Sequence, residues 1–148
     1  MAGTTEVEIL LIEDNPGDTD LVLEALSNNK VKNKVHTVDD GEKALDFLYK
    51  RGAYIDAPTP DLVFLDLNLP KVSGKEILQD IKANENLRDI PVVVLSSSQA
   101  DKDVAQSYNL RANAYVVKPV DLNQFLTVVQ EIEHFWIDIV KLPSNKGS

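Results

Sequence analysis

The sequence predicts an α/β fold with a doubly wound, five-stranded parallel sheet, on two observations. Strand-length apolar segments alternate with helical segments five times, with short connections between them, and this alternation is typical of parallel sheets with right-handed crossovers. Four of the five strand segments are almost continuously apolar, as expected for strands that helices cover on both faces. A chain of 148 residues fits one such domain.

The five strand segments differ in polarity. The four apolar ones begin at Val7 (VEILLI), Asp61 (DLVFL), Pro91 (PVVVL) and Asn113 (NAYVV). The remaining one, residues 34–38 (KVHTV), is more polar, so we expect it at an edge of the sheet.

Five helical segments follow the strands. The first runs from Pro16 to Leu26, with Asn15 as its N-cap and Pro16 at its first position. The others are expected at four places: after Asp40-Gly41, from Ser73-Gly74 to Asn84, over residues 101–108, and from the N-cap Asp121 to about residue 140. We therefore expect a single domain over residues 1–148, with a core of about 7–137, a long loop at 51–60 and a frayed tail at 141–148.

Composition restricts the partners. The formal net charge is −9, from 24 acidic and 15 basic residues, and such a field repels nucleic acid and anionic membranes. Cysteine is absent, which excludes disulfides and thiolate metal sites, and His36 and His134 have no nearby ligand set. No window approaches ~18 apolar residues, and the apolar run Ile9–Ile12 is too short for a signal peptide. We expect a cytoplasmic protein with no nucleic-acid or membrane partner.

Polar residues stand where four of the predicted strands end. They are Glu13 and Asp14 after the first strand, Asp66 at the end of the third, Ser96 after the fourth and Lys118 after the fifth. Ligands of open parallel sheets bind outside the carboxyl ends of the strands, so these side chains are expected to converge. Each residue alone would suit a helix cap, a turn or a surface charge, but together they predict a ligand site.

The residue types in this site favour a metal ion and a phosphoryl group. Three clustered carboxylates raise one another's pKa unless a cation lies among them, and oxygen ligands without His or Cys favour Mg²⁺. With Mg²⁺ and Lys118, about +3 would meet about −3 from the carboxylates, so a dianionic phosphoryl group could enter. One carboxylate could then attack phosphorus and form an acyl phosphate. The metal, Lys118 and Ser96 would each hold one phosphoryl oxygen.

Four motifs, in this order, resemble the receiver domain of two-component response regulators over about residues 7–137: LIEDNP, LDLNLP, VVVLSSS and YVVKP. The resemblance implies a flavodoxin-like (βα)5 fold with strand order 2-1-3-4-5 and Mg²⁺-dependent phosphoryl transfer from a sensor histidine kinase. The long loop 51–60, the phrase LDLNLPK and the extended last helix make the chain similar to the small cyanobacterial response regulators that pair with phytochrome histidine kinases.

The resemblance also implies the ligands of the metal. Asp66 is the expected phosphoacceptor, forming 4-aspartylphosphate, and also a metal ligand. Asp14 is the expected main metal carboxylate, Glu13 acts mostly through bound water, and the backbone carbonyl of Asn68 completes the set. Glu13 stands where Asp is commoner in the family, and Ser73 stands where many relatives have Asp before the Gly. We expect neither departure to cost activity.

Three further residues have implied roles in signalling. Ser96 resembles the switch hydroxyl and Lys118 the phosphate-binding lysine. Tyr115 resembles the aromatic rotamer switch, although it could instead be an ordinary strand aromatic.

The last predicted helix carries more apolar residues than one stripe facing the sheet needs. The stripe itself consists of Leu122, Phe125, Leu126, Val129 and Ile132. The surplus consists of Val140 and of four side chains that are expected at a dimer interface, Val128, Phe135, Trp136 and Ile139. The loop 51–60 could cover this surplus surface, or a partner could, because exposed aromatic patches usually mark interfaces. A homodimer through the fourth helix, fifth strand and fifth helix fits the patch and the resemblance.

We therefore expect a phosphoacceptor that signals through a conformational change of this face and is no enzyme beyond its own phosphorylation and dephosphorylation. One alternative is a phosphorylation-independent interaction domain. Another is an aspartyl-phosphate hydrolase of the dehalogenase type, which would need a second Asp where Asn68 stands. A flavin mononucleotide binder is disfavoured by the acidic loop EDNPGD, because a flavin phosphate needs amide and hydroxyl donors.

Overall fold

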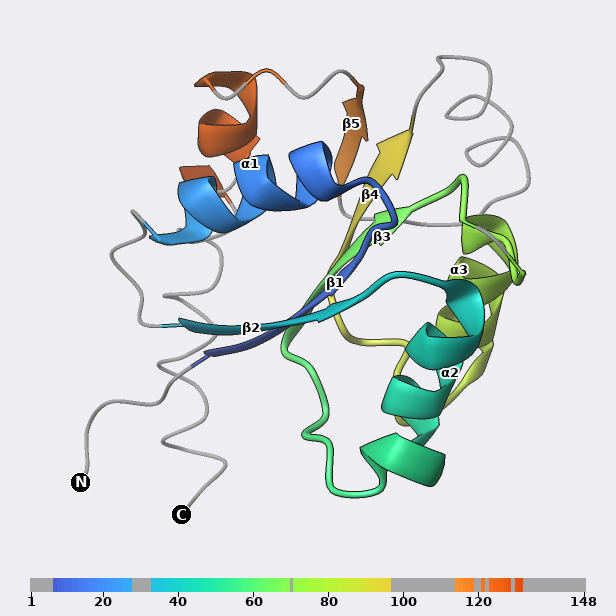
Figure 1. Ribbon diagram of the computed structural model, residues 1–148. Coiled ribbons are helices and arrows are strands. Elements are labelled where there is room, and N and C mark those ends of the chain that lie inside the picture. The colour runs from blue at the N-terminus through green and yellow to red at the C-terminus, as the bar shows by residue number, and fades with distance from the viewer. Residues whose placement is uncertain are drawn as a thin grey trace, which may run out of the picture.

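One parallel sheet of five strands organises the chain (Figure 1). The computed structural model describes residues 7–27, 33–69, 71–96, 114–118, 121, 123–128 and 130–131. The strands are β1 (Val7–Ile12), β2 (Asn33–Val38), β3 (Leu62–Asp66), β4 (Val92–Ser96) and β5 (Ala114–Val117). Their order in the sheet is β2-β1-β3-β4-β5, which confirms the predicted order 2-1-3-4-5 and places the more polar segment at an edge.

Helices cover both faces of the sheet (Figure 1). Helix α1 (Pro16–Ser27) and the helical residues 123–128 and 130–131 lie on one face, and α2 (Gly41–Tyr49) and α3 (Gly74–Ala83) lie on the other. The predicted helix at 101–108 lies outside the described residues. None of the helices that the structure describes has the length and apolar character needed to span a membrane.

Four N-caps begin these helices, and those at Asn15 and Asp121 were predicted. The side chains of Asn15, Asp40, Ser73 and Asp121 accept hydrogen bonds from the backbone N–H three residues later, at 3.0, 2.8, 3.3 and 3.2 Å. Such caps satisfy backbone donors that the first turn of a helix leaves without partners. Each cap fixes the residue at which a helix begins. It therefore also fixes where the loop that leads from the preceding strand ends.

The core consists of two apolar clusters, one on each face of the sheet. Every residue of β3 and β4 is buried, and consecutive residues of β3 alternate between the two clusters, which confirms that helices cover both faces. Phe125 is fully buried, and its ring centroid lies 5.4 Å from that of Phe64 on β3. Burying such a side chain contributes roughly 1.5–3 kcal/mol, so this contact holds the last helix on the sheet.

The long loop packs on the α2 side. It contains a short 3₁₀ helix, η1 (Gly52–Tyr54), and the Tyr54 ring centroid lies 5.6 Å from that of Phe47 on α2. Tyr54 and Ala57 join the cluster under α2 and α3, whereas Phe125 belongs to the cluster on the opposite face. The loop therefore lies across the sheet from the described part of the last helix.

Two strands differ from the prediction by one residue. β3 begins at Leu62 rather than Asp61 and ends at Asp66 as predicted, whereas β4 begins at Val92 and ends at Ser96, each one residue later than predicted. The ladder continues because the Leu67 N–H donates to the Leu95 carbonyl at 3.0 Å and the Lys118 N–H donates to the Ser96 carbonyl at 2.7 Å. Both predicted site residues, Asp66 and Ser96, are therefore held by regular sheet rather than by loops.

Candidate functional site

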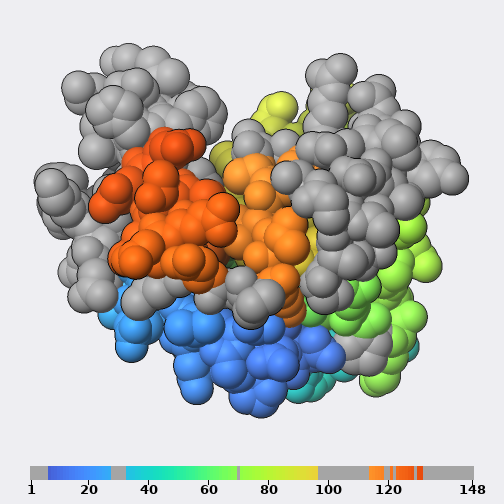
Figure 2. Space-filling view, turned by 90° about the horizontal axis from the view of Figure 1, so that it is seen from above, coloured from blue at the N-terminus to red at the C-terminus, as the bar shows by residue number. Residues whose placement is uncertain are grey.

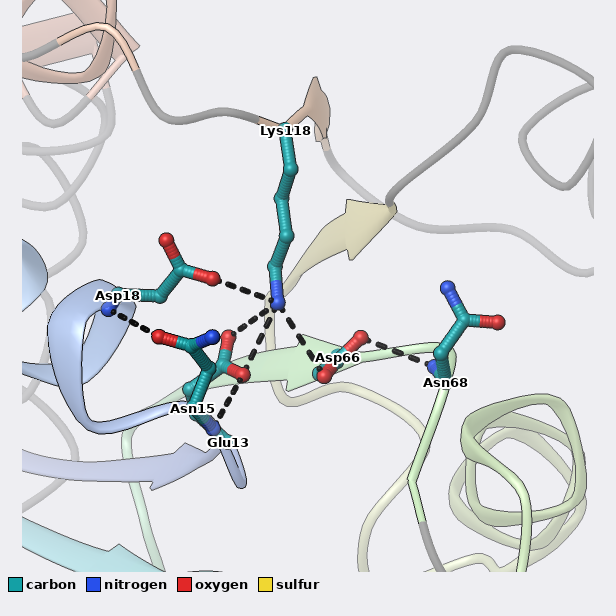
Figure 3. Close-up of polar contacts among 6 residues, drawn as sticks. All are labelled: Glu13, Asn15, Asp18, Asp66, Asn68 and Lys118. Atoms are coloured by element: carbon teal, nitrogen blue, oxygen red, sulfur yellow. Dashed lines mark hydrogen bonds and ion pairs between the residues drawn. The ribbon is translucent and has the colours of Figure 1, made fainter.

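The carboxyl edge of the sheet brings most of the predicted site residues together (Figure 3). Glu13 follows β1, Asp66 ends β3 and Lys118 follows β5. The Glu13 N–H donates to the Val38 carbonyl at 3.0 Å, so the backbone at Glu13 continues the pairing of β1 with β2. Asp66 is only 1% exposed. The side chains converge because neighbouring parallel strands end at the same edge.

Three carboxylates form a compact cluster in this site. One oxygen from each of Glu13, Asp14 and Asp66 lies within 4.8 Å of the others. Glu13 and Asp66 are buried, whereas Asp14 is exposed. A cavity of about 340 Å³ opens beside Glu13 and Asp14 at the start of α1, so the cluster is accessible from solvent.

The Lys118 ammonium lies at the centre of the site. Its Nζ lies 2.9 Å from each carboxylate oxygen of Glu13 and donates to Oε2. It also lies 3.0 Å from Asp18 Oδ2 and 3.3 Å from Asp66 Oδ2. Burial alone would lower the pKa of Lys118, but the hydrogen bonds to Glu13 and Asp18 raise it above its ordinary value. The lysine is therefore a permanent cation.

The two acidic residues after β1 are hard to ionise together. Burial raises the pKa of Glu13 to about 7; the hydrogen bond from Lys118 opposes this shift, and the Asp66 charge adds to it. Desolvation, together with the Asp66 carboxylate, also raises the pKa of Asp14. Both shifts are typical of carboxylates that are withdrawn from water close to another carboxylate.

The donor set fits a hard divalent cation. Glu13 Oε1 is buried, and its described contact is the ion pair with the Lys118 ammonium at 2.9 Å, not a hydrogen bond. A carboxylate oxygen has more than one lone pair, so Oε1 can also bind a metal ion or a water held by one. Carboxylates without His or Cys are the ligands that Mg²⁺, Mn²⁺ and Ca²⁺ prefer.

Asp66 is oriented by its own turn. The Asn68 N–H donates to Asp66 Oδ1 at 2.9 Å, while Oδ2 faces Lys118. The Asn68 side chain points away from the Asp66 carboxylate (Figure 3), so its backbone is the part that contacts the site. The role of its carbonyl as a metal ligand stays a prediction.

The two proposed switch residues occupy the neighbouring strands. Ser96 is buried at the end of β4 and pairs in register with Val117. Tyr115 is half-buried on β5 and packs against the cluster under α2 and α3.

The proposed dimer residues are mostly not described. Val128 is partly buried against the cluster on the α1 face, so part of its surface is used inside the molecule. Phe135, Trp136 and Ile139 lie outside the described residues. The interface stays a prediction.

Two contacts of the site were not predicted. Asp18 pairs with Lys118, and the Asn15 N–H donates to Glu13 Oε2 at 3.1 Å (Figure 3). Asp18 stands one helical turn after Asp14 at the start of α1, and this spacing could have indicated it. Away from the site, His36 Nε2 lies 2.7 Å from Glu8 Oε1.

Residues 9–130 match the family described as response regulator receiver domain. The chain belongs to this family. The receiver is 43% identical over 136 residues to the response regulator Rcp1 of Synechocystis sp., covering 92% of each chain. The flavodoxin-like receiver fold and the family resemblance are thereby confirmed.

Solved structures agree with this assignment. The receiver matches the phosphorylated cyanobacterial phytochrome response regulator RcpA with a TM-score of 0.78 and 45% identity, over 90% of this chain and 95% of that one. It matches the Mn²⁺-bound form of Rcp1 with a TM-score of 0.77 and 43% identity, over 88% and 94% of the two chains. The receiver is thus a response regulator homologous to these proteins, and its acidic cluster suits a divalent metal.

Proposed function

We propose that this receiver takes a phosphoryl group from a sensor histidine kinase onto Asp66, with Mg²⁺ held by Glu13, Asp14, Asp66 and the Asn68 carbonyl. The observation that carries the proposal is the environment of Asp66. Its carboxylate is buried, one oxygen accepts a backbone hydrogen bond, and the other lies 3.3 Å from a lysine ammonium. A carboxylate fixed at both oxygens beside two further carboxylates suits nucleophilic attack on phosphorus when a cation is present.

The charge balance supports a requirement for a metal. Glu13, Asp14, Asp18 and Asp66 supply four carboxylates, and Lys118 is the cation that contacts three of them in the described structure. A dianionic phosphoryl group entering this field would be repelled. When bound, magnesium supplies positive charge next to the charge that develops on the phosphoryl oxygens.

The transfer forms one bond and breaks one. An Asp66 oxygen attacks phosphorus while the bond from phosphorus to the kinase imidazole breaks, and the imidazole keeps the electron pair. Lys118 then donates to a phosphoryl oxygen, and the Ser96 hydroxyl donates to another. Attack by water on the acyl phosphate returns Asp66 to its carboxylate, so the receiver catalyses only its own phosphorylation and dephosphorylation.

The signal would leave through the face that includes β5. Movement of Ser96 toward the phosphoryl group would draw Tyr115 inward and change the surface of the fourth helix, β5 and the fifth helix. Figure 2 shows β5 and the helical residues 123–128 and 130–131 side by side at the surface, next to α1. The receiver would use this surface to form a homodimer. Its place of action would be the cytoplasm. The phytochrome response regulators that the receiver matches support a phytochrome-type kinase as the donor.

Intact-mass spectrometry after incubation with acetyl phosphate tests the phosphoacceptor. We expect a single phosphoryl adduct with Mg²⁺, and none with EDTA or in Asp66→Asn. Asp61→Asn, which changes an exposed acid at the other end of β3, is the matched control and should be phosphorylated normally. An adduct that persists in Asp66→Asn would refute the site, and no adduct in the unmodified protein would refute the function.

A phosphotransfer assay tests the partner. A radiolabelled phytochrome histidine kinase should transfer its phosphoryl group to the receiver faster than a kinase of another sensory class does. Equal transfer rates from the two kinases would refute the proposal that the donor is a phytochrome-type kinase.

Sedimentation of Phe135→Ala and Trp136→Ala tests the dimer. An unchanged mass of the assembly in both variants would reject the proposed interface.

A further inference from the structure

The Lys118 ammonium has three N–H groups and contacts three carboxylates. Two of the contacts, to Glu13 at 2.9 Å and to Asp18 at 3.0 Å, are shorter than the 3.3 Å contact to Asp66. The Lys118 and Asp18 side chains are only 12% and 18% exposed, so water screens their ion pair less than it screens a surface pair. Asp18 is thus part of the environment that fixes the lysine.

The start of α1 fixes Asp18. Its N–H donates to Asn15 Oδ1 at 3.0 Å, so Asp18 occupies the third position of the helix after the cap. An acidic residue at this position often accepts a hydrogen bond from the backbone N–H of the cap residue. In this receiver the Asn15 N–H donates to Glu13 Oε2 instead, which leaves the Asp18 carboxylate available to Lys118 (Figure 3).

We propose that Asp18 is a positioning residue for phosphoryl transfer: together with Glu13 it occupies two N–H groups of Lys118 and directs the third toward the Asp66 oxygen where the phosphoryl group arrives. The contact to Asp66 is the longest of the three, so it is the one that a phosphoryl oxygen replaces. Asp18 touches neither the phosphorus nor its oxygens. This inference rests on the phosphoacceptor function proposed above.

Asp18→Asn tests the proposal, because Asn keeps the side-chain shape and removes the charged acceptor. The matched control is Asp20→Asn, which removes the same charge two residues further along α1, at an exposed position. With saturating phosphoramidate and Mg²⁺, we expect the maximal rate constant of phosphorylation to fall about tenfold in Asp18→Asn. Asp20→Asn should stay within about twofold of the unmodified protein, because Asp20 is exposed at the wall of the cavity and water screens its charge.

A conservative variant separates positioning from folding. Asp18→Glu restores the carboxylate and should recover the rate to within about threefold of the unmodified protein. The phosphoramidate concentration that gives half the maximal rate should change little in all three variants. Equal rates in Asp18→Asn and Asp20→Asn, a faster Asp18→Asn, or no recovery in Asp18→Glu would each overturn the proposal.

A second readout needs neither metal nor phosphate. In the metal-free protein, the Lys118 ammonium protons should exchange slowly enough to be observed by heteronuclear NMR, with Lys118→Arg assigning the signal. The signal should broaden in Asp18→Asn and persist in Asp20→Asn; an unchanged signal in Asp18→Asn would overturn the contact. If the unmodified protein accepts no phosphoryl group while this pattern holds, the proposed function fails and the contact stands.

Discussion

Gly74, the first residue of α3, packs against the backbone of Asp66 so closely that a Cβ atom at this position would overlap the Asp66 carbonyl oxygen and the Leu67 Cα. The Gly74 N–H also donates to the Leu67 carbonyl at 3.1 Å. The start of α3 and the end of β3 therefore form one rigid unit. The residue that is proposed to accept the phosphoryl group is positioned by this packing.

Gly74→Ala should lower both stability and phosphorylation. Forcing a methyl group against backbone requires α3 or the end of β3 to shift, at about 1–3 kcal/mol. Urea unfolding and the intact-mass assay measure the two effects. Gly52→Ala is the control, because Gly52 has φ 58° and open space around it. It should lose stability and keep its phosphorylation rate, and the same rate loss in both variants would reject the positioning by Gly74.

Lys118→Met should change metal binding and phosphorylation in opposite directions. Removing the ammonium leaves the three carboxylates without their cation, so Mg²⁺ should bind at least about tenfold tighter. The phosphoryl group loses one of its donors, so the adduct should form at least about tenfold more slowly. Calorimetry and mass spectrometry check the two changes. Weaker Mg²⁺ binding in the variant would show that Lys118 does not compete with the cation.

Mg²⁺ affinity should rise with pH through neutrality. Since burial raises the pKa of Glu13 to about 7, a proton occupies this carboxylate at lower pH and competes with the metal. Calorimetric titrations at pH 6 and pH 8 should show the tighter binding at pH 8. Glu13→Gln should flatten this dependence. A steep dependence in that variant would assign the proton to another group.

The raised pKa of Glu13 also predicts how the stability of the metal-free protein depends on pH. Because the folded-state pKa of Glu13 lies above its ordinary value of 4.5, the folded state binds more protons than the unfolded state between these two values. The contribution of Glu13 is fully present below about pH 4.5 and is lost as the pH rises through about 7. The free energies of urea unfolding of the unmodified protein and of Glu13→Gln should therefore change differently with pH in this window. Parallel plots of the free energy of unfolding against pH would contradict the raised pKa of Glu13.

Phe125→Ala should detach the last helix. The side chain is fully buried against Phe64, so its removal should cost about 3–5 kcal/mol. Phe125→Leu preserves most of the buried volume and should cost less than about 1.5 kcal/mol. Urea unfolding measures the stability of the two variants. Equal losses of unfolding free energy would show that the packing of the Phe125 ring is not the cause of the loss.

The sequence was sufficient for the sheet and for the convergence of its polar residues. In a parallel sheet all carboxyl ends meet at one edge, so the residue at each strand end could be located without coordinates, as for Asp66 and Lys118. The exact strand ends could not, because the last ladder bond depends on the register of the neighbouring strand. β4 extends to Ser96, which pairs with Val117, for this reason.

The pairing of Asp18 with Lys118 was missed for a different physical reason. An acidic residue in the first turn of a helix is stabilised by the helix dipole and by the free N–H groups of that turn. Asp18 therefore needed no distant partner to explain it. Its spacing from Asp14 could have placed it near the site, but the coordinates were needed to show that Glu13 accepts the Asn15 N–H and that Asp18 turns to the lysine.

The contacts of Lys118 also have a consequence for folding order. Lys118 joins Glu13 across 105 positions of the chain and Asp66 across 52, and contacts of such long sequence separation are slow to form. They need β1, β3 and β5 to be paired in register before the ammonium can reach its acceptors. In refolding experiments, competence to accept phosphate should therefore emerge only with the final native phase. A chain that is still being synthesised would therefore be unable to accept a phosphoryl group from its kinase until β5 has paired with the sheet.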